Sequence, residues 1–271
     1  MSLSDLDVAP AIDVRGLSKS YGPVGKGGQR VVKAVDDVSF RIERGRAYGL
    51  VGESGSGKST IGRMIAHLIK PDTGEIKLLG RDWLHLSGDE LRRQRRHVQM
   101  IFQSPYASLD PRWRVFDIVA EPLRTLSRMP ANELHHRCET EIRRVGLSAS
   151  ALEKYPHQFS GGQRQRIAIA RALITSPSVL IADEPVSALD VSIQAQILEL
   201  LREILSRESL SILFISHDLS VVNYLCDQVG VLYRGRLVES GSTDKIFANP
   251  GSDYTKSLIA AVPGQVRRRL A

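Results

Sequence analysis

Cysteine is scarce in this sequence: the 271 residues contain two, Cys138 and Cys226. They lie far apart and lack the paired spacing of a thiolate metal site or a redox motif. The histidines are also scattered, without cysteines or acids at ligand spacing. We therefore expect two free thiols, buried or half-buried, and no metal site built from protein side chains alone.

Long hydrophobic runs are absent as well. No window of the sequence approaches an uncharged apolar stretch long enough to span a bilayer. Residues 1–10 contain acids where a secretory signal has a basic start and an apolar centre. The length of the chain is enough for one large core, or for a main domain with an inserted or appended lobe. We expect a cytoplasmic protein that folds alone.

Aromatic residues make up only 6% of the sequence, although the net charge is +7 and the pI is about 9.6. Basic surface attracts nucleic acid through its phosphates. The basic residues gather, however, in two short runs at 91–97 and 266–269, without interleaved aromatics that could stack on bases. We therefore expect no nucleic-acid partner. A solvated basic face is the first explanation of the runs, and an anionic membrane surface or a partner's acidic loop is the second.

A glycine-rich motif is the first feature that indicates chemistry. Residues 52–60 read GESGSGKST and match the phosphate-loop pattern G-x-x-x-x-G-K-[ST] in full. An apolar strand at 47–51 precedes the motif and a helix at 60–69 follows it, which is the context that the motif requires. We expect Lys58 to neutralise the β- and γ-phosphates and Ser59 to coordinate Mg²⁺. The predicted nucleotide-binding residues of this loop are Gly52, Ser54, Gly55, Gly57, Lys58, Ser59 and Thr60.

Two acids end an apolar strand predicted at 179–182. Asp183 would hold Mg²⁺ through water, as a carboxylate at a buried strand end can. Glu184 would then lie beside the γ-phosphate, as a general base or as the group that orients the attacking water. Two surface acids at a strand end are the alternative, which the phosphate loop upstream makes the weaker one.

Two more polar residues follow apolar strands. His217 comes after a strand at 211–215, and Gln103 after a strand at 98–102. Ligands gather at the carboxyl ends of parallel strands, so we expect His217 to contact the γ-phosphate. Gln103 would sense Mg²⁺ or the attacking water. A structural histidine and a polar strand terminus are the alternatives.

A second anion-binding segment lies further along the chain. Residues 160–163 read SGGQ and open a basic helix, so that the Ser160 hydroxyl and the glycine N–H groups lie at a helix start. A chain that already has a phosphate loop does not need a second one for the same purpose. The two segments therefore serve different nucleotides, or one nucleotide from two sides.

Alternating strands and helices predict an α/β fold. Further strands are expected at 12–17, 31–42, 75–79 and 229–233, and further helices at 193–206 and 219–224. This alternation favours a mainly parallel sheet covered by helices. Between 104 and 159 the segments are helical, are interrupted by prolines and include no convincing strand, which indicates an inserted helical lobe.

Together these segments resemble the nucleotide-binding subunits of ABC transporters, over nearly the whole chain. Residues 160–163 look like the signature motif of that family, preceded by Phe159 in place of the usual leucine. Gln103 matches the Q-loop glutamine, and His217 matches the switch histidine. Residues 187–190, which end in Asp190, match the D-loop. Tyr21 matches the A-loop aromatic that stacks on adenine. For Tyr21, a packed tyrosine is the alternative.

The resemblance implies a fold and a division into domains. The fold is a P-loop NTPase core of the ABC ATPase type, with a mixed, mainly parallel sheet, N-terminal antiparallel strands and an inserted helical subdomain. The ATP-binding core would comprise 1–103 and 161–245, the helical subdomain 104–160 and a C-terminal extension 246–271.

The resemblance also implies assembly, because two such domains pair head to tail with ATP between one phosphate loop and the other signature helix. The second chain would contribute its signature residues and D-loop to the nucleotide. The implied catalytic residues are Glu184, His217 and Gln103, the metal ligands Ser59, Gln103 and Asp183, and the signature and D-loop contacts Ser160, Gly161, Gly162, Gln163 and Asp190.

A narrower resemblance is to the importer branch for oligopeptides, dipeptides and nickel, and within it to the F-type subunit. It rests on residues 50–58, 99–111 and 183–196 and on the tail at 249–263. The F-type subunit usually pairs with a D-type paralogue, and a homodimer is the alternative. Some members carry an iron–sulfur centre in the tail, but no cysteine follows Cys226, so we expect none.

The implied function is ATP hydrolysis at the cytoplasmic face of the membrane. It would drive import of di- or oligopeptides or related solutes through two membrane permease subunits, with a periplasmic or extracellular solute-binding protein as an indirect partner. A soluble ABC ATPase in DNA repair or ribosome-associated work is the first alternative, although no coiled-coil insert, zinc motif or second ATPase half is present. A regulatory nucleotide-binding subunit is the second, although Glu184 and His217 favour hydrolysis.

Overall fold

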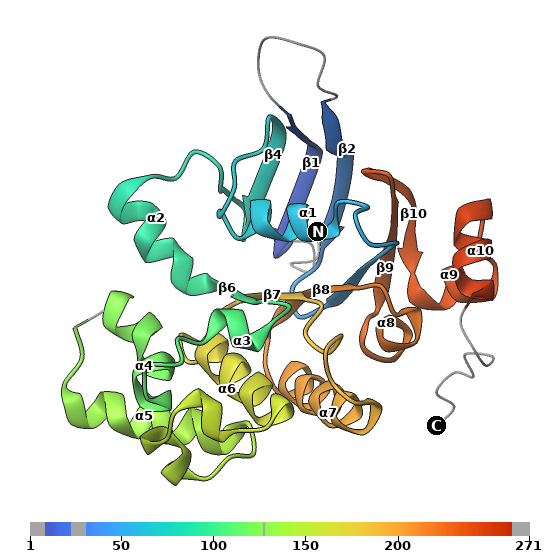
Figure 1. Ribbon diagram of the computed structural model, residues 1–271. Coiled ribbons are helices and arrows are strands. Elements are labelled where there is room, and N and C mark those ends of the chain that lie inside the picture. Colours follow the sequence, from blue (N-terminus) through green and yellow to red (C-terminus); the bar gives the residue numbers. More distant parts are fainter. Residues whose placement is uncertain (1–8, 23–30, 127, 262–271) are drawn as a thin grey trace, which may run out of the picture.

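A mainly parallel sheet forms the centre of the computed structural model, which describes residues 9–22, 31–126 and 128–261 (Figure 1). Among these residues the sheet has six strands in the order β10-β9-β3-β8-β7-β6. Neighbouring strands are parallel except β10, which runs antiparallel to β9. The strands are β3 (Ala47–Val51), β6 (Val98–Ile101), β7 (Val179–Asp183), β8 (Ser211–Ser216), β9 (Gln228–Tyr233) and β10 (Arg236–Ser242).

A smaller antiparallel sheet lies at the N-terminal end of the chain. Its strands follow the order β2-β1-β4-β5 among the described residues. They are β1 (Ile12–Tyr21), β2 (Val32–Ile42), β4 (Thr73–Leu78) and β5 (Arg81–Asp82). Helix α1 (Lys58–Ile65) packs with this sheet and with one face of the larger sheet in a single apolar cluster. The predicted fold class, a mixed, mainly parallel sheet with N-terminal antiparallel strands, is confirmed.

Except for β10, the strands of the larger sheet are mostly buried, which explains why they read as short apolar runs. In β8, Leu213 and Ile215 pack toward α1 and the antiparallel sheet, whereas Ile212 and Phe214 pack toward the helices on the other face. This alternation follows from the two-residue period of a strand. The sheet therefore holds the ends of β6, β7 and β8 in fixed register at one edge.

Helices cover the other face. They are α3 (Pro105–Ser108), α4 (Val115–Leu126), α5 (Ala131–Arg144), α6 (Gly161–Leu173), α7 (Val191–Arg207) and α8 (Leu219–Leu225), with short 3₁₀ turns at Ala149–Glu153 and Pro156–Gln158. The described residues between 104 and 160 contain no strand. Their buried side chains belong to the same cluster as that face of the sheet. The division into an ATP-binding core and a helical subdomain stays a prediction.

Helix α2 (Gly88–Gln94) and strand β10 are among the elements that were not expected from the sequence. Helix α2 carries Arg92 and Arg93 of the basic run 91–97, whose other basic residues form a 3₁₀ turn at Arg95–His97. The helix has no buried residue, so it lacks the apolar period by which a helix is recognised. Strand β10 forms a hairpin with β9 and alternates between exposed and half-buried residues. Helix α1 also begins at Lys58, within the phosphate-loop motif.

The chain continues after β10 with α9 (Thr243–Ala248) and α10 (Asp253–Ala260). The predicted boundary of the C-terminal extension, between 245 and 246, falls inside α9. The basic run at 266–269 lies outside the described residues.

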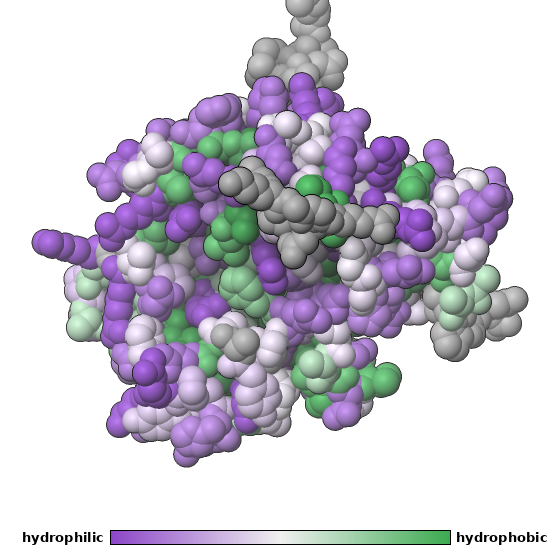
Figure 2. Space-filling view, turned by 45° about the horizontal axis from the view of Figure 1, so that its top comes forward, coloured by the Kyte–Doolittle hydropathy of each residue, from purple (hydrophilic) through white to green (hydrophobic). Residues whose placement is uncertain are grey.

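Both cysteines are buried free thiols, as expected. Burial raises the pKa of Cys138 to about 12, so little of this thiol is in the reactive thiolate form at neutral pH. Across the described ranges, the helices are too short or too polar to cross a bilayer. On the face shown in Figure 2, hydrophilic residues predominate and hydrophobic residues form small separate patches.

Candidate nucleotide-binding site

The phosphate-loop motif connects β3 to α1 in a conformation that requires glycine. Gly52, Gly55 and Gly57 have φ angles of +152°, +80° and +108°. A Cβ at Gly52 would lie 2.1 Å from the carbonyl oxygen of Leu232, and a Cβ at Gly57 would lie 2.2 Å from that of Ala34. Any side chain at either position would collide with backbone. The loop is therefore held closely between the end of β9 and strand β2.

Lys58 is a buried cation at the start of α1, with 4% of its surface exposed. Its Nζ donates to the carbonyl oxygens of Gly52 at 2.7 Å and Glu53 at 2.8 Å. Burial lowers the pKa of Lys58, while the nearby carboxylates of Glu184 and Asp183 act in the opposite direction. The Lys58 ammonium thus lies between the carbonyl groups of the loop and the two acids. A bound anion would offset the hydration that this ammonium loses on burial.

Asp183 ends β7 and is 2% exposed. The Ser59 hydroxyl donates to its Oδ1 at 2.7 Å. Burial raises the pKa of Asp183, although the Ser59 hydrogen bond and the charges of Arg63 and Lys58 oppose this effect. A buried carboxylate beside a hydroxyl is an oxygen donor set of the kind that Mg²⁺ prefers, and a cation here would relieve the cost of the buried charge. The residues present therefore fit the metal.

Glu184 adopts a strained backbone conformation next to this pair. Its φ of +47° lies in the left-handed region, which a residue with a Cβ rarely occupies. Its side chain is 12% exposed, and its Oε2 accepts a hydrogen bond from Gln103 Nε2 at 3.0 Å. The Nδ1 of His217 lies 3.3 Å from the same oxygen. The ends of β6, β7 and β8 therefore bring the three predicted catalytic side chains together.

A cavity of about 260 Å³ opens over the loop. Eight of the predicted residues line this cavity. Asp183 and His217 do not line it, but each contacts a lining residue: Asp183 contacts Ser59, and His217 contacts Glu184. The lining residues are Ala34, Ser54, Gly55, Gly57, Lys58, Ser59, Thr60, Gln103 and Glu184.

The SGGQ segment lies elsewhere, at the start of α6. Ser160 is the N-cap: its Oγ accepts from the Gln163 N–H at 3.3 Å, and Gln163 Oε1 accepts from the Ser160 N–H at 3.0 Å. A Cβ at Gly162 would lie 2.4 Å from Cγ2 of Ile193, so α6 and α7 approach closely there. Gly161 packs beside Leu189, next to the D-loop residue Asp190 at the N-cap of α7. None of these residues lines the phosphate-loop cavity of its own chain.

Tyr21 is also separate from the cavity wall. It is the last residue of β1, pairs with Val32 of β2, and is 46% exposed. The Nζ of Lys19 lies 5.9 Å from its ring centroid. Its ring is thus neither packed in the core nor part of the described cavity.

Among the contacts with the loop, those from β2 and from the β9–β10 turn have no motif in the sequence. Ala34 of β2 lines the cavity, and the Gly235 N–H donates to the Ser56 carbonyl at 2.9 Å. Ala34 lies in an ordinary strand pattern, so nothing in the sequence indicates this role. Gly235, with a φ of +84°, occupies the β9–β10 turn, and the sequence could at most have predicted that turn.

A phosphate loop between strand and helix, with polar residues at neighbouring strand ends of a mainly parallel sheet, defines a P-loop nucleotide-binding protein. The sequence pattern of the family described as ABC transporter matches residues 35–187. The chain belongs to this family, as the sequence predicted.

Two curated relatives resemble nearly the whole chain. The dipeptide transport ATP-binding protein DppF of Haemophilus influenzae is 47% identical over 257 residues, which cover 94% of this chain and 78% of that protein. The oligopeptide transport ATP-binding protein AppF of Bacillus subtilis is 48% identical over 260 residues, covering 92% and 79%.

Solved structures with similar folds are ATP-binding cassettes. A dimeric post-hydrolysis state of the cassette MJ0796, bound to ADP and Pi, has a TM-score of 0.76 and 29% identity and covers 86% of this chain and 98% of that one. The cbiO1 protein from Clostridium perfringens, part of the ABC transporter complex cbiONQ, has a TM-score of 0.77 and 26% identity and covers 94% and 96%.

Proposed function

We propose that this chain hydrolyses ATP to power uptake of di- or oligopeptides, as a peripheral subunit at the cytoplasmic face of a membrane. The convergence of Lys58, Asp183 and Glu184 at the phosphate loop is the observation that carries the ATPase assignment. Relatives named for dipeptide and oligopeptide transport support the class of solute. Two permease subunits would form the path, and a solute-binding protein outside the membrane would deliver the peptide.

Hydrolysis in this site needs positioning and a base. ATP would place its γ-phosphate in the cavity, where loop N–H groups donate to it and Lys58 neutralises its charge. A water oxygen attacks the γ-phosphorus, its proton passes to Glu184, and the bond to the bridging oxygen of the leaving ADP breaks. Gln103 and His217 hold the Glu184 carboxylate in place, and His217 would donate to the γ-phosphate.

Ser59, Asp183 and Gln103 would hold Mg²⁺. The ion would neutralise charge on the β- and γ-phosphate oxygens. In the chain itself, the Ser59 hydroxyl already orients the Asp183 carboxylate.

Because Ser160–Gln163 and Asp190 lie outside their own chain's cavity, we assign them to the nucleotide of a second ATPase subunit. That subunit would be a D-type paralogue or a second copy of this chain. Tyr21 would stack on adenine from the end of β1, where its ring is exposed. The dimeric cassette that holds ADP and Pi supports a paired arrangement.

The substitution Asp183→Asn should raise the thermal stability of the chain when no nucleotide or metal is bound. Because burial raises the pKa of Asp183, the charged form costs stability as the pH rises through that pKa. The neutral amide removes this cost, and we expect Tm at pH 7.5 in EDTA to rise by about 2–4 °C, or roughly 1 kcal/mol. The added stabilisation by Mg²⁺·ADP should shrink. Thermal scans of Asp183→Asn beside Asp89→Asn, an exposed acid, measure both effects, and a lower Tm in EDTA would contradict the assignment.

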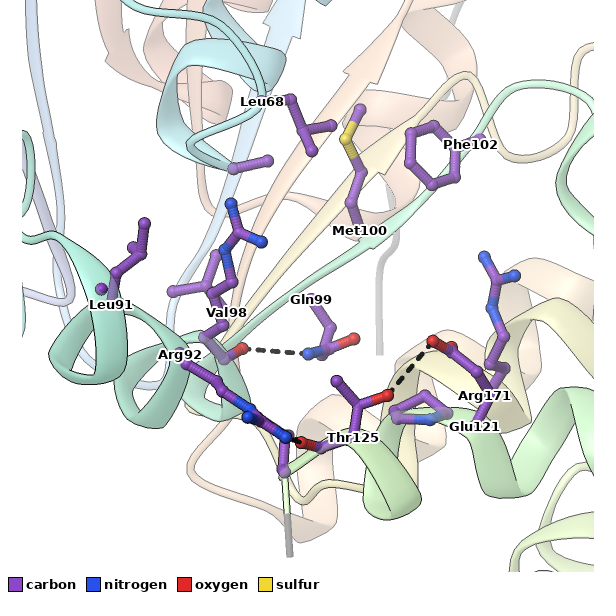
Figure 3. A pocket seen from close by; sticks show the side chains of 15 residues that line it. Leu68, Leu91, Arg92, Val98, Gln99, Met100, Phe102, Glu121, Thr125 and Arg171 are labelled. Carbon is purple, nitrogen blue, oxygen red and sulfur yellow. Dashed lines mark hydrogen bonds between the residues drawn. The ribbon is translucent and has the colours of Figure 1, made fainter.

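A groove of about 540 Å³ lies between the larger sheet and α4 (Figure 3). Leu68, Met100 and Phe102 form an apolar side of it. The Arg92 guanidinium donates to the Thr125 carbonyl across the groove and so ties α2 to α4. Phe102, which lines the groove, directly precedes Gln103 in the sequence. The Gln103 side chain donates a hydrogen bond to Glu184.

The charges of the groove indicate what would bind there. Arg92, Arg95 and Arg171 line it, and Glu121 is the one acid among the lining residues. A cytoplasmic segment of a permease subunit, with an apolar side chain for Phe102 and Met100 and a carboxylate for the arginines, fits this chemistry. We propose this groove as the docking site of the permease, which links the transport path to Gln103.

Arg95→Glu should weaken permease binding by about tenfold or more, because it places like charges in the interface. ATP hydrolysis by the isolated chain should stay unchanged, since Arg95 does not line the nucleotide cavity. Tagged chain is incubated with detergent-solubilised membranes, and bound integral proteins are identified and quantified by mass spectrometry. Arg207→Glu, an exposed reversal on α7, is the control. Equal recovery with both variants would contradict the groove assignment, and recovery of only DNA or ribosomes would contradict transport.

A further inference from the structure

The C-terminal helix α10 contacts the phosphate loop. The Tyr254 hydroxyl accepts a hydrogen bond from the Glu53 N–H at 3.2 Å. The Tyr254 ring lies against Tyr233, with centroids 4.2 Å apart and planes tilted by 36°. Tyr233 ends β9, the strand that pairs with β3 just before the loop. Two segments about 200 residues apart in sequence therefore meet beside the nucleotide site.

Helix α10 is a fixed support for this contact. It lies beside β10 at the edge of the larger sheet (Figure 1). The Glu239 carboxylate of β10 accepts from the N–H groups of Gly251 at 2.8 Å and Ser252 at 3.1 Å, directly before the helix. Thr255, the neighbour of Tyr254, is fully buried. These contacts hold the start of α10 against β10.

Glu53 is held through both of its backbone groups. Its N–H donates to Tyr254, and its carbonyl accepts from Lys58 Nζ at 2.8 Å. The Glu53 N–H is the donor that faces α10, while the cavity is lined by Ser54 and later residues of the loop. Tyr254 therefore fixes the loop from outside without occupying the place of a phosphate.

We propose that Tyr254 is a positioning residue that pre-orders the phosphate loop for nucleotide. The proposal rests on the proposed function, because it concerns affinity for ATP. A loop that is already ordered loses less conformational freedom when ATP binds. Without the Tyr254 hydroxyl, the Glu53 N–H would bond to water, and the loop would spend part of its time in other conformations. The C-terminal extension thereby contributes to nucleotide binding although it touches no nucleotide.

Tyr254→Phe tests this proposal, because it removes the hydroxyl and keeps the ring on Tyr233. We expect the Kd for Mg²⁺·ADP and the KM for ATP to rise roughly two- to tenfold, the range that corresponds to one neutral hydrogen bond. The kcat should change less than twofold, because the catalytic groups stay in place. The control is Tyr233→Phe, which removes the other hydroxyl of the ring pair and leaves the Glu53 contact intact. Calorimetry and steady-state kinetics on the full chain give these values.

A second measurement separates positioning from simple stability. If Tyr254 couples α10 to the loop, nucleotide must in turn protect α10, because coupling between two sites is reciprocal. Amide exchange in α10 should slow when Mg²⁺·ADP binds to the wild type, and slow much less in Tyr254→Phe.

Equal affinities for both variants would overturn the proposal, as would a fall in Tm with KM and kcat changing together. Absence of nucleotide binding by the wild type would instead overturn the proposed function. The two failures are therefore distinguishable.

Discussion

Glu184→Gln is expected to slow ATP hydrolysis by roughly 10²–10⁴-fold, the usual contribution of a general base, while ATP binding stays close to wild type. Glutamine has the same shape but cannot accept the proton of the attacking water. The hydrogen bonds that hold the side chain can partly persist, because an amide oxygen can still accept from Gln103 Nε2. The loss would therefore report the proton transfer and not a collapse of the site.

The same variant should accumulate as a nucleotide-bound pair of subunits. If two chains close on ATP and hydrolysis reopens them, a site that binds but does not hydrolyse stays closed. Light scattering after gel filtration with Mg²⁺·ATP should show the doubled mass in Glu184→Gln and not in Glu203→Gln, a matched change on the exposed side of α7. Turnover within tenfold of wild type would show that Glu184 is not the base. A monomer that retains ATP would point to an obligatory paralogue as the second subunit.

The sequence was sufficient where burial leaves a periodic pattern. Strands β3, β7 and β8 are buried on both faces and therefore read as short apolar runs, and their polar ends marked Asp183, Glu184 and His217. Helix α2 was missed because none of its residues is buried, so its sequence shows no apolar period. Strand β10 was missed because its half-buried positions are mostly polar or glycine, so its alternation in burial leaves no apolar pattern in the sequence. The parallel register then placed the ends of β7 and β8 side by side.

The details of the candidate site depend on contacts that cross the fold. The left-handed backbone conformation of Glu184 could not be predicted from the sequence. A residue other than glycine disfavours this conformation, so the sequence alone indicates the opposite. The contact between Tyr254 and Glu53 joins residues about 200 positions apart, and no local pattern specifies it. Tyr21 and residues 160–163 do not line the phosphate-loop cavity of their own chain, so their roles in nucleotide binding stay predictions.

Lys58→Ala should weaken the binding of ATP itself, whereas Glu184→Gln should leave binding intact and slow hydrolysis. Lys58 is 4% exposed, and alanine would remove its hydrogen bonds to the Gly52 and Glu53 carbonyls. It would also remove one cation from the surroundings of Asp183 and Glu184. Phosphate would then meet an excess of negative charge. A charged hydrogen bond contributes about 1.5–3 kcal/mol, so we expect affinity for Mg²⁺·ATP to fall about 10- to 100-fold or more.

Calorimetric titration of Lys58→Ala beside Lys70→Ala separates this effect from a general loss of positive charge, because Lys70 is exposed beyond the end of α1. The Lys70 variant should bind as the wild type does. The Lys58 variant should also form no closed pair with ATP, in contrast to Glu184→Gln, because subunits cannot close on a nucleotide that does not bind. If Lys58→Ala binds ATP normally, the motif at 52–60 is not the phosphate site. A closed pair that forms without Lys58 would mean that the opposing signature segment, and not the loop, supplies most of the affinity.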